Sequence, residues 1–221
     1  MNPSEPAKKF FSISEAIEEG WRLTRSHLGN ILLLEIVGLL IFVVISLLSG
    51  TFIAPLHAFG AALNTVIQWL LSAFLGVAAI QIALKIVDGK EFGIEDLFNK
   101  QGIVLNYFGA FLLSNLAFIL GLICFIIPGL IIGIRFGFFG FFVVDKFASS
   151  TEALKLSWEL IKGCSWRMFF FQVSIVLINL MGILCFGIGL LITLPVTVLA
   201  ATTVYRKLLL QTFKNETNTL S

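Results

Sequence analysis

The sequence predicts an all-α membrane protein with six transmembrane helices, and three observations lead to this fold class. Of the 221 residues, 58% are apolar and only 13% are charged, whereas about 25% of a soluble domain is charged. The mean hydropathy of the chain is +0.99. Long stretches are apolar at every position, without the period-two alternation of a membrane β-barrel. The +2 net charge also excludes nucleic-acid binding, because it supplies no strong basic field for phosphates.

The stretch before the first long apolar segment predicts an amphipathic helix at the membrane surface. Ser12 and Glu15 form an S-x-x-E capping box, in which both side chains satisfy free N–H groups at a helix start. Ala16 and Trp21 share the apolar face, and we expect Trp21 to anchor the helix among the lipid headgroups. Residues 1–29 are therefore expected to form a cytoplasmic segment.

Six apolar segments are candidates for spanning a bilayer, which takes about 20 residues at about 1.5 Å per residue. They are residues 30–48, 61–84, 104–126, 129–144, 168–186 and 188–204. Every Lys and Arg except Arg135 falls on one side of these spans. Because basic residues are retained on the cytoplasmic side, we expect both termini in the cytoplasm and the protein in the inner (plasma) membrane.

The chain also contains an internal repeat. The stretch Ser149–Glu152 repeats the capping pattern, and Trp158 occupies the position that corresponds to Trp21, as a second expected interfacial anchor. A weaker third copy begins near Gly93. Three parallel units are predicted, each a surface helix followed by a helical hairpin; duplication that builds a stable bundle and a transporter built from repeats both explain this pattern. The expected parts are residues 1–29, hairpin 30–87, units 88–146 and 147–207, and a cytoplasmic tail 208–221.

Three stretches of the chain resemble a superfamily of bacterial six-span membrane proteins. They are Ile127-Pro-Gly-Leu-Ile-Ile-Gly-Ile-Arg135, Val143-Val-Asp-Lys146 and Glu152-Ala-Leu-Lys-Leu-Ser-Trp158. The superfamily includes the membrane domain found ahead of the catalytic domain in some glycerophosphodiester phosphodiesterases, and stand-alone uncharacterised relatives. The resemblance implies the six-span fold in a bacterial inner membrane. We expect no enzyme activity, because the six spans and their connections account for the chain and leave no catalytic domain.

Glu35 and Arg135 are the two charged residues placed well inside the expected spans. A charge near the bilayer centre costs at least ~2.5 kcal/mol, so such residues usually face the bundle interior and pair with one another. We therefore expect a buried pair, direct or water-bridged, that either locks the bundle or lines a polar pathway. The remaining alternative is that the two charges do not pair.

The dipeptide Pro128-Gly129 predicts a tight chain reversal between the third and fourth spans. Proline lacks an N–H and disfavours helix in the residue before it, so the third span is expected to end near Ile126. Gly129, Gly133 and Gly137 recur every four residues, which places them on one face of the fourth span. Such a face allows the backbone of a neighbouring helix to approach closely.

The sequence contains no recognisable catalytic, metal-binding or cofactor-binding motif. We therefore expect a non-enzymatic protein that organises the membrane or binds a partner through its cytoplasmic surface. The alternative is a carrier for a lipid or small amphiphile. The expected partners are the lipid bilayer and a lipid ligand or membrane protein, and not nucleic acid. A carrier predicts an open path that reaches Arg135, whereas an organiser predicts a closed, glycine-packed bundle.

Overall fold

The computed structural model describes residues 9–53, 55, 57–97, 101–185 and 187–220, and these residues form helices and loops without any strand. Residues 1–8 of the expected amino-terminal segment and Ser221 of the expected tail lie outside this description. The helices are, in chain order, α1 (Ile13–Ser26), α2 (Leu28–Phe52), α3 (His57–Val87), the 3-10 helix η1 (Ile94–Leu97), α4 (Gln101–Cys124), α5 (Ile126–Arg135), α6 (Phe139–Lys146), α7 (Ser150–Ile161), α8 (Ser165–Leu184) and α9 (Leu190–Leu220).

Six helical segments of the described chain are long and apolar enough to cross a membrane, which confirms the predicted all-α class and the number of spans. They are Leu28–Phe52, Ala58–Val87, Gly102–Ile123, Ile127–Lys146, Ser165–Leu184 and Leu190–Thr212. Each overlaps one of the expected segments. The last helix continues to Leu220, so the expected tail is helical as far as that residue. No Gly or Pro follows Val204 to end the helix.

Helix α1 begins where the capping pattern predicts. Ser12 is its N-cap, and the Ser12 Oγ accepts a hydrogen bond from the Glu15 N–H at 3.4 Å. Its small residues Ala16, Gly20 and Thr24 are buried, and the helix packs along α9. The part of the expected membrane-facing side that holds Ala16, Gly20 and Thr24 is therefore covered by α9 and not by lipid headgroups, because small side chains allow α1 to approach the α9 backbone directly.

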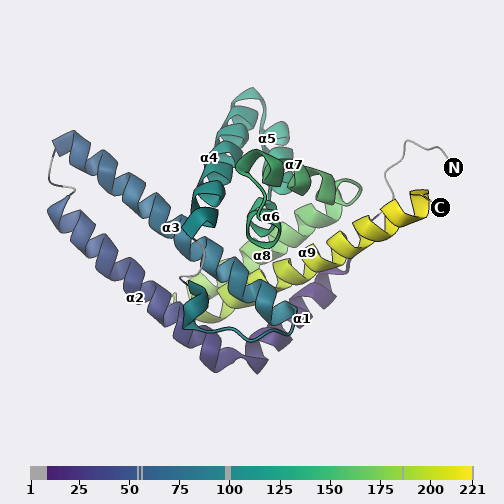
Figure 1. Cartoon of the computed structure of the whole chain (residues 1–221), viewed down its shortest axis with the longest axis horizontal. Helices are drawn as coiled ribbons and strands as arrows, with labels where there is room; N and C mark the ends of the chain where they lie inside the picture. The colour runs from purple at the N-terminus through teal and green to yellow at the C-terminus, as the bar shows by residue number, and fades with distance from the viewer. Residues whose placement is uncertain (1–8, 54, 56, 98–100, 186, 221) are drawn as a thin grey trace.

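The second half of α2 and the first half of α3 extend together away from the other helices, and α4 and α5 form a close pair (Figure 1). The reversal between α4 and α5 lies at Phe125, whose extended backbone (φ −167°, ψ 149°) separates the two helices. The predicted position of this turn at Pro128-Gly129 is therefore wrong by a few residues. Pro128 instead lies in the first turn of α5, where a missing N–H breaks no helical hydrogen bond.

The fourth span is interrupted between α5 and α6. The hydroxyl of Ser157 on α7 donates to the Arg135 carbonyl oxygen at 2.7 Å and accepts from the Phe138 N–H at 3.1 Å. One buried side chain therefore satisfies a backbone acceptor and a backbone donor that the interrupted helix leaves free. Non-helical backbone at membrane depth requires such partners, because no water or lipid group there replaces them.

The main apolar core lies where α3, α6, α7 and α9 meet. Phe138 and Tyr205 are the largest side chains there and are fully buried. Their rings lie 6.0 Å apart, and the Phe141 ring stacks on Tyr205 at 5.1 Å. Aromatic side chains of the fourth span therefore fill the centre of the protein and fix how α6 and α9 cross.

Candidate functional site

Glu35 and Arg135 lie in different parts of the structure. Glu35 belongs to α2, which packs against α1, α3 and α9, whereas Arg135 ends α5, which packs against α4, α7 and α8. No ion pair joins the two side chains in the described structure, and the Glu35 Oε2 and Arg135 Nε atoms are buried without a hydrogen-bond partner among the described residues. The expected Glu35–Arg135 pair is therefore wrong, because the two helices that carry these charges pack against different neighbours.

The charge of Arg135 is compensated by an aromatic ring. The Arg135 guanidinium lies 4.2 Å from the centroid of the Trp158 ring, a cation–π contact. The Phe136 ring also lies against Trp158, with the ring centroids 5.8 Å apart. Trp158 is half-buried and contacts Arg135 and Phe136 of the fourth span, and its role as an interfacial anchor stays a prediction. Trp21 keeps 51% of its surface exposed, and its role as an interfacial anchor stays a prediction.

The three glycines of the fourth span occupy two different environments. Gly129 and Gly133 face α4: a Cβ on Gly129 would lie 2.8 Å from Leu122, and a Cβ on Gly133 would lie 3.1 Å from the Phe118 ring. Gly137 lies in the break after α5, where a Cβ would meet a glutamine side chain of α8 at 2.6 Å. The expected common face therefore holds for two glycines and ends with the helix at Arg135.

An apolar cleft of about 740 Å³ lies between α2, α3 and α9. Helix α2 contributes one face, whose residues recur at intervals of three and four: Ile31, Leu34, Glu35, Gly38, Leu39 and Phe42. The opposite walls include Ile82 and Ala79 of α3 and Pro195 and Leu191 of α9. This volume lies within the range of about 300–1,000 Å³ that is typical of ligand-binding pockets.

Among the described residues that line the cleft, Glu35 alone is charged. Its buried Oε2 has no protein partner, and an unsatisfied polar atom of this kind costs about 1–3 kcal/mol. Water or a ligand that hydrogen-bonds to Glu35 would recover this energy. The cleft therefore combines a large apolar surface with one polar group that is free to orient a bound molecule.

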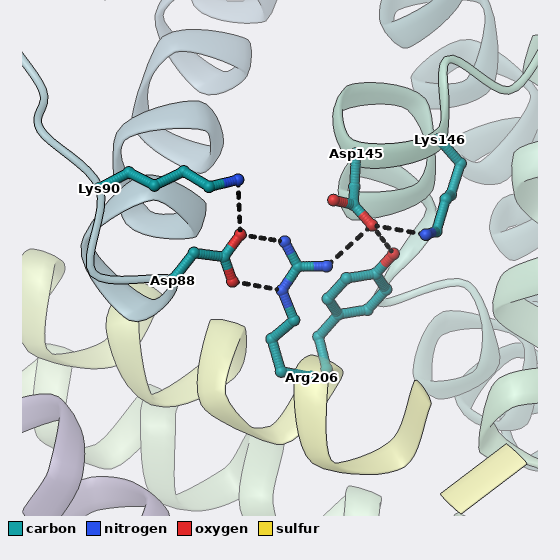
Figure 2. A network of polar contacts seen from close by, with 6 residues as sticks. Asp88, Lys90, Asp145, Lys146 and Arg206 are labelled. Atoms are coloured by element: carbon teal, nitrogen blue, oxygen red, sulfur yellow. Dashed lines mark hydrogen bonds and ion pairs between the residues drawn. The ribbon is translucent and has the colours of Figure 1, made fainter. Parts of the chain in front are cut away.

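A charged network joins the ends of α3 and α6 to the middle of α9 (Figure 2). The Arg206 guanidinium donates two hydrogen bonds to Asp88, at 2.9 and 2.7 Å, and one to Asp145, at 3.0 Å. The Tyr205 hydroxyl donates to the same Asp145 oxygen at 3.0 Å. Arg206 and Asp88 keep 22% of their side-chain surfaces exposed, and Asp145 keeps 13%. These residues therefore tie three helices together at a partly buried position.

The sequence places Asp88, Asp145 and Arg206 near the ends of three of the expected spans but gives no pairing among them. One signal for the first two is present: Val87-Asp88 and Val144-Asp145 repeat a Val-Asp pair at the ends of two apolar segments. The partner Arg206 carries no such signal, because it lies 118 residues after Asp88. The pairing depends on the tertiary structure, which places the ends of α3 and α6 beside the middle of α9.

A second ionic contact fixes η1 on α3. The Lys85 ammonium lies 2.7 Å from the Asp96 carboxylate, which also accepts hydrogen bonds from the Gly93 N–H at 3.0 Å and from Gln81 at 3.4 Å. Burial by itself raises the pKa of Asp96, but the hydrogen bonds from Lys85 and Gly93 and the positive charge of Lys85 lower it more. The net pKa of Asp96 therefore lies below its ordinary value, and the ionised form stabilises this loop.

Within the described part of the chain, no three His, Cys, Asp or Glu side chains are grouped so that they could hold a metal ion. Over 128 residues the chain is 37% identical to uncharacterised proteins of Mycobacterium bovis and Mycobacterium tuberculosis. The match covers 57% of this chain and 38% of each relative, so it spans well under half of the relatives' length. No family model and no solved structure matches the chain. The apolar helices and these relatives support a multi-pass membrane protein of a bacterium.

Proposed function

We propose that this protein binds an amphiphile, with an acyl chain in the cleft between α2, α3 and α9. The observation that carries the proposal is the cleft itself, which joins an extended apolar lining to the single unpartnered carboxyl group of Glu35. An acyl chain bound in the cleft covers the apolar lining, which would otherwise contact water or disordered lipid. A polar group of the amphiphile satisfies Glu35.

Of the two predicted functions, the cleft favours a carrier for a lipid or small amphiphile over a protein that organises the membrane. The close packing of Gly129 and Gly133 against α4 fits the closed bundle of a membrane organiser, but the α2–α3 side of the molecule is open. The cleft reaches Glu35 and not Arg135, so the path differs from the one expected for a carrier. The proposal is therefore binding and presentation of an amphiphile without enzyme activity. A role in organising the membrane or binding a protein partner stays a prediction.

The proposal includes an orientation in the inner membrane with the charged network on the cytoplasmic side. It is supported by the concentration of basic residues near the ends of the spans that carry Asp88, Asp145 and Arg206. These three residues occupy corresponding positions of the three proposed hairpin units, each near the inner end of the second helix of its unit. A reporter enzyme fused to the carboxyl terminus, active only in the cytoplasm, tests this orientation.

A bulky substitution inside the cleft tests the binding proposal. In Ala79→Phe the new ring occupies the cleft, whereas Ala62→Phe places the same ring on an exposed part of α3 outside it. Each variant is purified in detergent, stripped of loosely bound lipid and analysed by native mass spectrometry. We expect tightly held lipid on the wild-type protein and on Ala62→Phe, and its loss from Ala79→Phe. Equal lipid retention by both variants would contradict the proposal.

A further inference from the structure

A polar recess of about 430 Å³ adjoins the apolar cleft. Ile86 lines both cavities, so the recess continues the cleft toward the start of α2 and the end of α3. The other residues that line the recess are His27, Asn30, Gly89, Lys90, Glu91 and Phe92. A polar cavity beside an apolar one is complementary to an amphiphile, which has a polar head and an apolar chain. A polar head fits the recess, and a hydrocarbon chain fits the cleft.

Lys90 lines the recess and can bind an anion there in addition to its long ion pair with Asp88. Both oxygens of its neighbour Asp88 already accept short hydrogen bonds from Arg206, at 2.9 and 2.7 Å. The Lys90 Nζ forms an ion pair with Asp88 at 3.7 Å, a contact longer than a hydrogen bond (Figure 2). A partly exposed pair of this length is weak, so Lys90 can also interact with an anion in the recess. The Lys90 side chain is 68% exposed, and the exposed amide of Asn30 adds two further donors to the same recess. The recess therefore offers several donors to one anionic group.

Glu91 gives the recess a negative charge beside these donors. Its side chain is exposed and forms no ion pair with any described residue. A simple anion would be attracted by Lys90 and repelled by Glu91. A zwitterion, with a phosphate and an ammonium group, complements both charges at once.

The distance between Glu35 and the recess fits the order of groups in a phospholipid, in which ester linkages separate the head group from the acyl chains. Asn30 and Glu35 are five residues apart on α2, which is about 7.5 Å along the helix axis. Ile31 lies between them on the wall of the cleft. A head group near Asn30 therefore places the ester linkages near Glu35 and the hydrocarbon chain beyond it.

We propose that the recess binds the head group of a zwitterionic phospholipid of the phosphoethanolamine type. Lys90 and Asn30 hold the phosphate, and Glu91 holds the ammonium. The protonated carboxyl of Glu35 donates a hydrogen bond to an ester carbonyl oxygen, and one acyl chain lies in the cleft. This inference rests on the proposed function, because it assigns the head group of the same ligand.

The test compares three lipids with identical dioleoyl chains, namely phosphatidylethanolamine, phosphatidylglycerol and diacylglycerol, titrated into the delipidated full-length protein in detergent. We expect phosphatidylethanolamine to bind about tenfold more tightly than diacylglycerol, the effect of one charge-assisted contact. Lys90→Ala removes this preference. The control Lys155→Ala, which changes an exposed lysine of α7 away from the recess, keeps it.

Glu91→Gln gives an independent test that leaves the Lys90 contacts in place. We expect this variant to lose the preference for phosphatidylethanolamine over phosphatidylglycerol while it still prefers both to diacylglycerol. Equal binding of phosphatidylethanolamine and diacylglycerol by the wild type overturns the head-group site and leaves the acyl-chain cleft standing. Equal binding of the two phospholipids by the wild type overturns the zwitterion assignment. If none of the three lipids binds, the proposed function itself fails.

Discussion

The Arg206 guanidinium binds the Asp88 carboxylate through two parallel hydrogen bonds of 2.9 and 2.7 Å, and so joins α9 to the end of α3. This two-point contact is the strongest geometry for an arginine and a carboxylate. A third bond, from Arg206 to Asp145, brings in α6. These contacts hold the ends of α3 and α6 against the middle of α9. The cleft lies between α9 and the nearest parts of α2 and α3, which contribute lining residues between 31 and 42 and between 75 and 86.

Replacement of Arg206 by Met is expected to lower the free energy of unfolding by about 2 kcal/mol, because two partly buried carboxylates lose their donor. Arg206→Lys should restore only part of this stability, since an ammonium cannot bond two carboxylates with the same geometry. The measurement is thermal unfolding in detergent. Arg22→Met is the matched control, because Arg22 pairs with Glu19 on an exposed surface, where ion pairs contribute little. Equal effects of Arg206→Met and Arg22→Met would contradict a structural role for the network.

Ser157→Ala is expected to destabilise the protein by about 1–3 kcal/mol, since it leaves the Arg135 carbonyl and the Phe138 N–H without a partner inside the bundle. Hydrogen exchange of the Phe138 amide should also accelerate. Ser174→Ala serves as the control, because the Ser174 hydroxyl bonds only to a carbonyl of its own helix. An unchanged exchange rate at Phe138 in Ser157→Ala would show that the break in the fourth span does not depend on this hydroxyl.

Gly20→Ala is expected to weaken the packing of α1 on α9 at a cost of about 1–3 kcal/mol. An added Cβ would lie 2.5 Å from the Val196 carbonyl oxygen and 2.9 Å from the Ala200 nitrogen, and both are backbone atoms that cannot rotate away. Limited proteolysis within α1 should become faster. Gly29→Ala is the control, because nothing lies within 4 Å of its added Cβ. Unchanged proteolysis of Gly20→Ala would contradict the close α1–α9 contact.

Asp96→Asn is expected to lower the free energy of unfolding near neutral pH by about 1–3 kcal/mol, because it removes the charge that binds Lys85. The pKa of Asp96 is lowered in the folded protein, so its contribution is fully present above the unfolded pKa of about 3.9. It is lost as the pH falls through the lower folded value. The difference between wild type and variant, followed by thermal unfolding, should therefore shrink below about pH 4.

Glu95→Gln is the control for this pH dependence, because Glu95 is an exposed neighbour of Asp96 in the same 3-10 helix. It should show little change of stability at any pH. A difference between wild type and Asp96→Asn that stays constant at acidic pH would show that the Lys85–Asp96 contact is not the source of the stability.

Most elements of the fold were predictable from local patterns. The two serines marked the starts of α1 and α7, since Ser12 and Ser149 occupy their N-cap positions. Ser12 forms the expected capping hydrogen bond, whereas the Ser149 side chain forms none. The break in the fourth span was not predictable, because Ser157, which satisfies the free backbone groups, belongs to another helix. The same limit applied to Glu35 and Arg135. Their depth followed from their positions in the spans, but their partners depended on which helices pack together.

By itself, the sequence determined that the chain is all-α, that six helices are long and apolar enough to span a membrane, and that Glu35 is an isolated acid within one of them. These properties follow from composition and from contacts between near neighbours in the chain. The tertiary structure alone decided that Asp88 meets Arg206, that Arg135 meets Trp158, and that Glu35 lines a cleft. Each of these depends on how distant helices pack, and local sequence patterns do not encode which faces will meet.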